Sequence, residues 1–438
     1  MRDLGALLTV TAVLACIAGG LAYVGPQLKL SAETSRKAGH VLMGLLCLSF
    51  PWLFEQAWPV LLLCLVSLLI FSWVRTHSGP LRGVFHGVAR KSHGELLFPV
   101  SVTIMFLVQE NPITDYVVPI LILTVADAAG ALVGVNFGNS KYSTDEGSKS
   151  WEGSLAFFAM AFLCTFVPLL LFTPADLLAV SLIAVLVGLI IMLVEAVSWR
   201  GLDNLFIPLG TYLLLSIYLQ LSPDALLTRL LALAGIAIVL WLIRGRTYCR
   251  DGTMLASALY LYTVWVVGGV TWTLPPFALL VGYILLCPSS LREQQLGHSL
   301  ADLGVVVGVG SFWLFASVDS PKEDFFWPFA LSWIAQLAII SCVYFAWRQK
   351  ETRLPGAIAK AGAICLGLFI LPLTAAAGLH DTFKMLPVVV VTIIATVSIY
   401  WKIENDHFKN VKTPAKDWRK LAYGALTSSL GLLAAWIV

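Results

Sequence analysis

The sequence predicts an all-α integral membrane protein, a polytopic helical bundle of about sixteen transmembrane spans. Of its 438 residues, 59% are hydrophobic and only 12% are charged, which is typical of membrane proteins and excludes a soluble enzyme. Apolar stretches of about 17 to 25 residues, long enough to cross the hydrocarbon core, recur along the chain. The basic residues between these stretches are unevenly distributed, which supports the same fold class.

Most of the apolar stretches are long enough to span a bilayer. The first, residues 4–24, lacks the basic start and the small-residue cleavage pattern of a signal peptide, so we expect it to remain as a span. The weakest predictions are the short stretches 38–54, 96–109 and 277–287. The eight cysteines lie mostly in apolar segments without a C-x-x-C pair, so we interpret them as core residues.

The lysines and arginines alternate between the two sets of loops. One set holds 24 of the 28, and the other holds only Arg2, Arg229, Lys322 and Lys384. Short cytosolic loops carry the excess of basic residues, so this pattern predicts an even number of spans with both termini outside. The net charge of +3 is too small to indicate a nucleic-acid partner.

The segment 127–153, DAAGALVGVNFGNSKYSTDEGSKSWEG, places charged residues beside glycines between two apolar stretches. Charges such as Asp127, Lys149 and Glu152 are costly near a bilayer unless something pairs them, which indicates a functional site. Glycines such as Gly153 allow backbone N–H groups to approach a ligand closely, and a helix that starts after Ser150 would direct its positive end at an anion. The segment therefore predicts a phosphate site.

A second polar group, AETSRKAGH at residues 32–40, begins the second apolar stretch of the chain. At helical spacing Glu33, Lys37 and His40 share one face, with Arg36 beside His40. The alternative interpretation is an anchor at the cytosolic surface with an incidental histidine.

The loop 75–95 contains three histidines and several basic residues. It is typical of an amphipathic segment lying on the inner surface. A metal site formed by His77, His86 and His93 is the alternative, but their spacing matches no compact zinc pattern.

The segment EAVSWRGLDNLFIP, residues 195–208, carries two more carboxylates. Asp203 and Asn204 would cap the following helix, but capping does not explain Glu195. We expect Asp127, Glu195 and Asp203 at the inner ends of three spans, where their oxygens would suit Mg²⁺ bound to a nucleoside triphosphate.

Four motifs together resemble those of the dolichol kinase and phytol kinase family. They are SRKAGH at 35–40, DAAGALVG at 127–134 with FG at 137–138, KSWEGS at 149–154, and Glu195 with GLDNLFIP at 201–208. The resemblance covers roughly residues 30–215, in the family's order. That family includes CTP-dependent diacylglycerol kinases and is related to the phosphatidate cytidylyltransferases.

The resemblance implies a membrane kinase that uses CTP and Mg²⁺ to transfer the γ-phosphate to a polyprenol or isoprenoid alcohol at the cytosolic face. Such a reaction needs the attacking and leaving oxygens in line, and it needs the negative charge on the transferred phosphoryl group to be neutralised. The general base is left open among Glu152, Glu195 and His40. The implied site residues are as follows: catalytic, Asp127, Lys149, Glu152 and His40; nucleotide-binding, Lys149, Ser150, Gly153, Asn204, Gly134, Gly138, Arg36 and Lys37; metal-binding, Asp127, Asp203 and Glu195.

The chain is expected to divide into a catalytic membrane domain, residues 1–222, and a second helical domain, residues 223–438. The second half loosely repeats the layout of the first but lacks the aspartate and the Lys-Ser-x-Glu-Gly run. It reads as a degenerate repeat or an addition that holds lipid or acts as a scaffold. Two other functions stay open: a cytidylyltransferase, and a transporter, whose polar residues would lie near the membrane centre.

Overall fold

The computed structural model describes residues 2–29, 32–76, 93–247, 249–286, 298–318, 322–348 and 353–409. The chain forms two compact units, Met1–Ala232 and Leu233–Val438. The division expected from the sequence, at residue 222, falls immediately before helix α12 (Pro223–Ile243), whose residues belong to both units.

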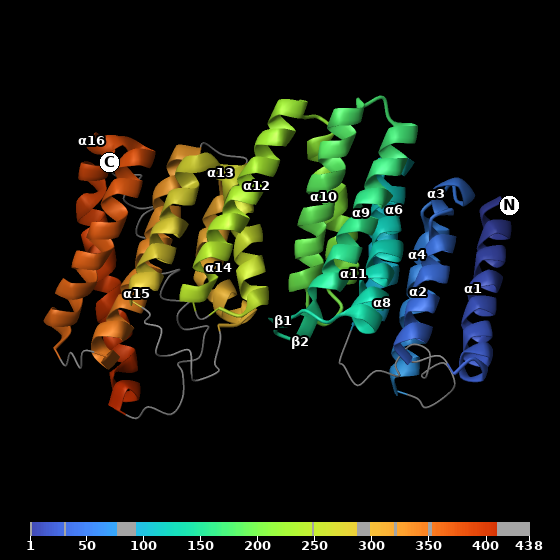
Figure 1. Ribbon diagram of the computed structural model, residues 1–438, viewed down its shortest axis with the longest axis horizontal. Coiled ribbons are helices and arrows are strands. Elements are labelled where there is room, and N and C mark those ends of the chain that lie inside the picture. Colours follow the sequence, from blue (N-terminus) through green and yellow to red (C-terminus); the bar gives the residue numbers. More distant parts are fainter. Residues whose placement is uncertain are drawn as a thin grey trace. The chain divides into compact units, whose positions relative to one another are not determined.

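The first unit is a helical bundle in which one end carries a small β-hairpin. Figure 1 shows the N-terminus and α3 at one end of this unit and the two strands at the other. Its elements are α1 (Arg2–Gln27), α2 (Ala32–Cys47), α3 (Phe50–Leu53), α4 (Trp58–Thr76), α6 (Gly94–Val108), η1 (Pro112–Val117), α7 (Val118–Leu121), η2 (Ile122–Ala126), α8 (Asp127–Phe137), β1 (Lys141–Thr144), β2 (Gly147–Ser150), α9 (Trp151–Phe172), α10 (Leu177–Val197) and α11 (Asp203–Tyr218).

The hairpin is a local departure from the predicted all-α fold. Strands β1 and β2 pair antiparallel, with Lys141 opposite Ser150, and a two-residue turn joins them. Gly147 follows that turn with φ +132°, a conformation that glycine adopts without a steric penalty. These polar residues cannot continue a membrane helix, and the hairpin allows the chain to turn between α8 and α9.

Tight packing between helices α8 and α9 holds the hairpin's base. A Cβ atom added to Gly130 would lie 3.0 Å from the Cβ of Phe157. A Cβ atom added to Gly153 would lie 2.8 Å from the carbonyl oxygen of Gly130. Such short distances mean that the two backbones approach too closely for any side chain, as in other membrane helix pairs with small residues at the contact.

The second unit is built around helix α15 (Lys322–Arg348), which contacts α13 (Asp251–Leu286), α14 (Leu300–Ala316) and α16 (Leu354–Lys409). A short 3₁₀ turn, η3 (Arg244–Arg246), precedes α13. Aromatic side chains dominate the core: the rings of Trp272 and Phe329 lie 4.8 Å apart, and Trp333 packs against Gly310 of α14.

Nine helices in the described ranges are long and apolar enough to cross a membrane. This confirms a multi-pass helical membrane protein, whereas the number of about sixteen spans stays a prediction. Helices α13 and α16 each count once, although Gly269 (φ +78°) and Gly378 (φ +84°) interrupt their helical geometry. The short predicted stretches 38–54 and 96–109 correspond to α2 with α3 and to α6, which fall below the length of a full span.

Candidate active site

The KSWEGS motif lies where strand β2 meets helix α9. The helix begins at Trp151, as the sequence predicts, and Ser150 is its N-cap, with Oγ accepting a hydrogen bond of 3.1 Å from the N–H of Gly153. The carboxylate of Glu152 accepts a hydrogen bond of 2.9 Å from the N–H of Ser140. The motif thus closes the hairpin onto the start of α9 and fixes Lys149 at the last strand position before the cap.

Lys149 reaches across to the end of helix α10. Its Nζ donates to the Oε1 of Glu195 at 2.8 Å and to the backbone carbonyl of the same residue at 2.5 Å. Burial of this half-buried amine favours the neutral form, but Glu195 and then Asp203 outweigh it, so the pKa of Lys149 is raised. Lys149, Glu195 and Asp203 therefore form one charged group, with the lysine held in its cationic form.

Two of the predicted nucleotide-binding glycines, Gly134 and Gly138, face the same motif. An added Cβ at Gly134 would lie 3.2 Å from Ser150 Oγ, and one at Gly138 would lie 2.6 Å from that atom. Both glycines therefore bring α8 against the cap of α9. Their direct contact with a nucleotide stays a prediction.

The predicted residues of α2 lie against Asp127. Lys37 Nζ donates to Asp127 Oδ2 at 2.5 Å, and both side chains are buried, with 6% and 9% exposed. His40 Nε2 lies 3.0 Å from the carbonyl oxygen of Leu123 and 3.7 Å from Asp127 Oδ2. A carbonyl only accepts, so Nε2 carries the proton in the neutral ring and Nδ1 is the acceptor nitrogen.

Asp127 lies deeper in its helix than the sequence suggested. We expected it at the inner end of a span, but helix α8 continues to Phe137, ten residues or roughly 15 Å further along the axis. The eight residues after Asp127 are apolar or glycine and continue the helix. Asn136, the polar residue near its end, donates a hydrogen bond of 2.8 Å to the carbonyl oxygen of Leu132 within the same helix. A buried carboxylate at this depth needs the charge of Lys37.

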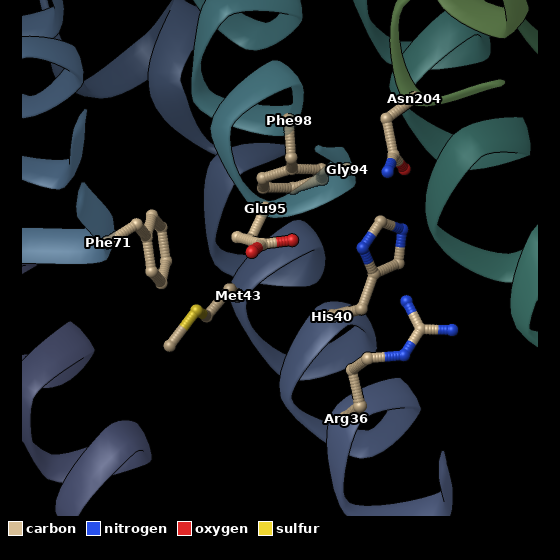
Figure 2. A pocket seen from close by; sticks show the side chains of 8 residues that line it. All are labelled: Arg36, His40, Met43, Phe71, Gly94, Glu95, Phe98 and Asn204. Carbon is tan, nitrogen blue, oxygen red and sulfur yellow. The ribbon is translucent and has the colours of Figure 1, made fainter. Parts of the chain in front are cut away.

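A cavity of about 50 Å³ adjoins His40. Figure 2 shows the amide of Asn204 and the guanidinium of Arg36 on either side of the imidazole, with Glu95 across the cavity. Asn204 is only 7% exposed, and its Oδ1 has no hydrogen-bond partner among the described residues. The predicted capping of α11 by Asp203 and Asn204 is wrong, because Leu202 holds the N-cap position without a side-chain hydrogen bond. The Oδ1 of Asp203 accepts a hydrogen bond of 3.0 Å from the N–H of Asn204.

Backbone contacts tie the connecting segments together at this end of the unit. Glu146 of the hairpin turn accepts a hydrogen bond from the N–H of Arg200, and the carbonyl of Arg200 accepts one of 2.8 Å from His93. Arg200 and Gly201 both adopt positive φ angles, 54° and 83°, in the turn before α11. The hairpin, this turn and the start of α6 are thereby held side by side.

The structure adds Glu95 and Arg75 to the candidate site. Arg75 Nε donates to Glu95 Oε1 at 2.9 Å, and Glu95 lines the cavity beside His40. This pair is not predictable from the sequence, because the two residues are twenty positions apart across a polar loop. His77 and His86 of the predicted loop lie outside the described residues, as does the side chain of Glu33.

The described ranges contain no group of three or more histidine, cysteine or acidic residues placed to hold a metal ion. Of the predicted metal ligands, Asp127 is paired with Lys37 and Glu195 with Lys149. Asp203 lies near enough to Lys149 to raise its pKa. The metal assignment stays a prediction that depends on ligands supplied by the substrate.

Comparison with known proteins identifies one informative relative. The chain is 31% identical over 186 residues to a phytol kinase from Synechocystis sp. (strain ATCC 27184 / PCC 6803 / Kazusa), and this match covers 42% of the chain and 78% of the relative. No protein-family model matches the chain, and no solved structure does. The relative's length is mostly covered at this identity, so the chain belongs to the phytol kinase family, as its four ordered motifs predict.

Proposed function

We propose that this protein is a CTP-dependent membrane kinase that transfers the γ-phosphate to a prenyl alcohol, such as phytol, at the cytosolic face. The observation that carries the proposal is that two ion pairs, Lys149 with Glu195 and Lys37 with Asp127, lie close to the start of α11. Asp203 of α11 raises the pKa of Lys149, and Asn204 lines the cavity beside His40. The family relative is a phytol kinase, and phosphoryl transfer needs this kind of charge placement more than covalent chemistry.

The nucleotide would bind at the hairpin. Lys149 is held cationic at the start of α9, next to the Ser150 cap, where a polyphosphate gains from the lysine charge and from the positive end of the helix. Arg36, which borders the cavity, would face the transferred phosphate. Lysine and arginine at these places neutralise negative charge on the nucleotide and on the transition state.

The acidic residues around Lys149 fit a magnesium ion that arrives with the nucleotide. Glu195 and Asp203 offer carboxylate oxygens, and Mg²⁺ commonly takes one or two protein carboxylates together with phosphate oxygens. When bound, the ion neutralises the phosphates. Asp127 would join it only if its pairing with Lys37 were to open, so we assign Asp127 to the Lys37–His40 group.

The general base is best assigned to His40. Its Nε2 donates to the carbonyl of Leu123, and Figure 2 shows the other ring nitrogen on the side of Glu95 and the cavity. A base must lie within hydrogen-bond reach of the proton it takes. By contrast, Glu152 closes the hairpin through Ser140, and Glu195 is paired with Lys149.

The proposal is tested with purified protein, phytol and CTP labelled at either the α- or the γ-phosphorus. A kinase moves the γ-label onto the lipid and releases CDP. Release of labelled pyrophosphate, with the α-label on the lipid, would instead show a cytidylyltransferase. Repeating the assay with ATP, GTP and UTP determines the nucleotide, and equal rates for all four would contradict CTP dependence.

A further inference from the structure

The small cavity beside His40 is polar on one side and apolar on the other. Figure 2 shows Phe71 and Met43 on one side of it and the charged and amide side chains on the other. Helices α2, α4, α6 and α11 supply its walls. The lining residues are Arg36, His40, Met43, Phe71, Gly94, Glu95, Phe98 and Asn204.

The polar side holds acceptors in fixed positions. Asn204 Oδ1 is buried without a partner among the described residues, and a buried carbonyl in that state gains from any donor that reaches it. Arg75 holds the carboxylate of Glu95 through contacts of 2.9 Å from both Nε and Nη2. The third nitrogen of Arg75, Nη1, lies 3.0 Å from His93 Nδ1, so Glu95 is oriented before any ligand arrives.

The dimensions of the cavity select the ligand. Its volume of about 50 Å³ exceeds the roughly 10–15 Å³ that one water needs but is far below the roughly 300 Å³ or more of a typical ligand pocket. The hydroxymethyl end of a chain fits this volume. Helix α4, which supplies Phe71, also exposes Leu69 and Trp73 on its outer surface, where an attached hydrocarbon tail would lie.

We propose that this cavity binds the hydroxyl end of the acceptor alcohol. On binding, the single O–H of the alcohol donates to Asn204 or Glu95, and it turns to Nδ1 of His40 when that base takes its proton. Met43 and Phe71 contact the first carbons of the tail. The inference rests on the proposed kinase function and adds the position of its lipid substrate.

Two variants separate alcohol binding from nucleotide binding. Met43→Trp fills the apolar side, and Glu95→Gln weakens the polar side. Each is expected to raise the KM for phytol by about tenfold or more while changing the KM for the nucleotide by less than about twofold. Leu171→Trp, on the exposed surface of α9, and Glu110→Gln, beside Arg2 and Trp52, are matched controls that should leave both constants unchanged.

Cross-linking provides a readout that does not depend on turnover or on a variant's folding. A phytol analogue with a diazirine next to its hydroxyl should label peptides that contain Met43, Phe71 or Phe98 in the wild-type protein, and excess phytol should prevent the labelling. Labelling elsewhere, or variants with an unchanged phytol KM in an active enzyme, would overturn the cavity assignment but leave the kinase proposal intact. A wild type that neither phosphorylates nor cross-links phytol would overturn both.

Discussion

At the scale of single residues, Lys149 is the cation that we expect to contact the phosphates. Replacement by methionine should lower kcat/KM for the nucleotide by about 10²-fold or more, because transition-state charge loses its neutralising partner. Lys141→Met is the matched control, since Lys141 is exposed in the same hairpin. Initial rates against CTP concentration measure the difference, and equal losses in the two variants would remove Lys149 from the site.

The raised pKa of Lys149 also predicts a pH dependence. A raised pKa in the folded state means that the charged amine stabilises the protein fully below its unfolded value of about 10.4, and this stability is lost as the pH rises through the higher folded value. The difference in Tm between wild type and Lys149→Met should therefore stay constant from pH 7 to about pH 10. A difference that already shrinks near neutral pH would contradict the raised pKa.

The sequence indicated candidate site residues but not the partners that the structure gives them. Four motifs identified Asp127, Lys149, Glu195 and Asp203, because charges in apolar sequence stand out. The pairing of Asp127 with Lys37 joins positions ninety residues apart, and only the fold can bring them together. Glu95 was missed for the same reason, since a carboxylate near a loop looks like ordinary surface.

At the scale of elements, the contact between α8 and α9 places the phosphate motif. Gly153→Ala would put a Cβ 2.8 Å from the carbonyl of Gly130 and 3.0 Å from Gly134 Cα. These are backbone atoms that cannot rotate away, so the variant should lose about 1–3 kcal/mol of stability. Gly235→Ala in α12, where an added Cβ meets nothing within 4 Å, should keep or slightly raise the Tm. Equal melting of both variants would show that α8 and α9 are not in close contact.

The helical elements follow from apolar length, whereas their irregularities do not. A helix that starts after Ser150 is expected from the sequence, and α9 begins there with Ser150 as its N-cap. The hairpin and the π-helical segments η1 and η2 were not predicted, because four-residue strands and extra residues within a helical turn leave no periodic pattern. The depth of Asp127 follows from the eight apolar or glycine residues after it, which continue α8 to Phe137.

At the scale of the whole molecule, the distribution of basic residues predicts which end of the first unit faces the cytosol. Glu110 lines a pocket with Arg2 of α1 and Trp52 of α3, and Figure 1 shows the N-terminus and α3 at the end of this unit opposite the hairpin. In sealed vesicles of known orientation, a membrane-impermeant maleimide should label Ser143→Cys from the cytosolic side only and Glu110→Cys from the other side only. Labelling of Ser143→Cys from the outer side would reverse the proposed orientation of the site.

The second unit has a continuous aromatic core but none of the four motifs. We propose that it supports the membrane fold or holds lipid, while residues of the first unit carry the chemistry. The match to the phytol kinase relative spans 186 residues. The first unit, Met1–Ala232, is long enough to contain a region of that length.

The account depends most on Asp127 and Lys37 being functional and not a structural ion pair. Removal of either partner alone leaves a buried charge and costs about 3–5 kcal/mol, whereas replacement of both by apolar residues is often neutral. The measurement is γ-phosphate transfer from CTP to phytol by the double variant Lys37→Met with Asp127→Leu, alongside its Tm. We predict a folded protein, with a Tm near that of the wild type, that transfers no phosphate. A double variant that folds and transfers phosphate at the wild-type rate would contradict the proposed site.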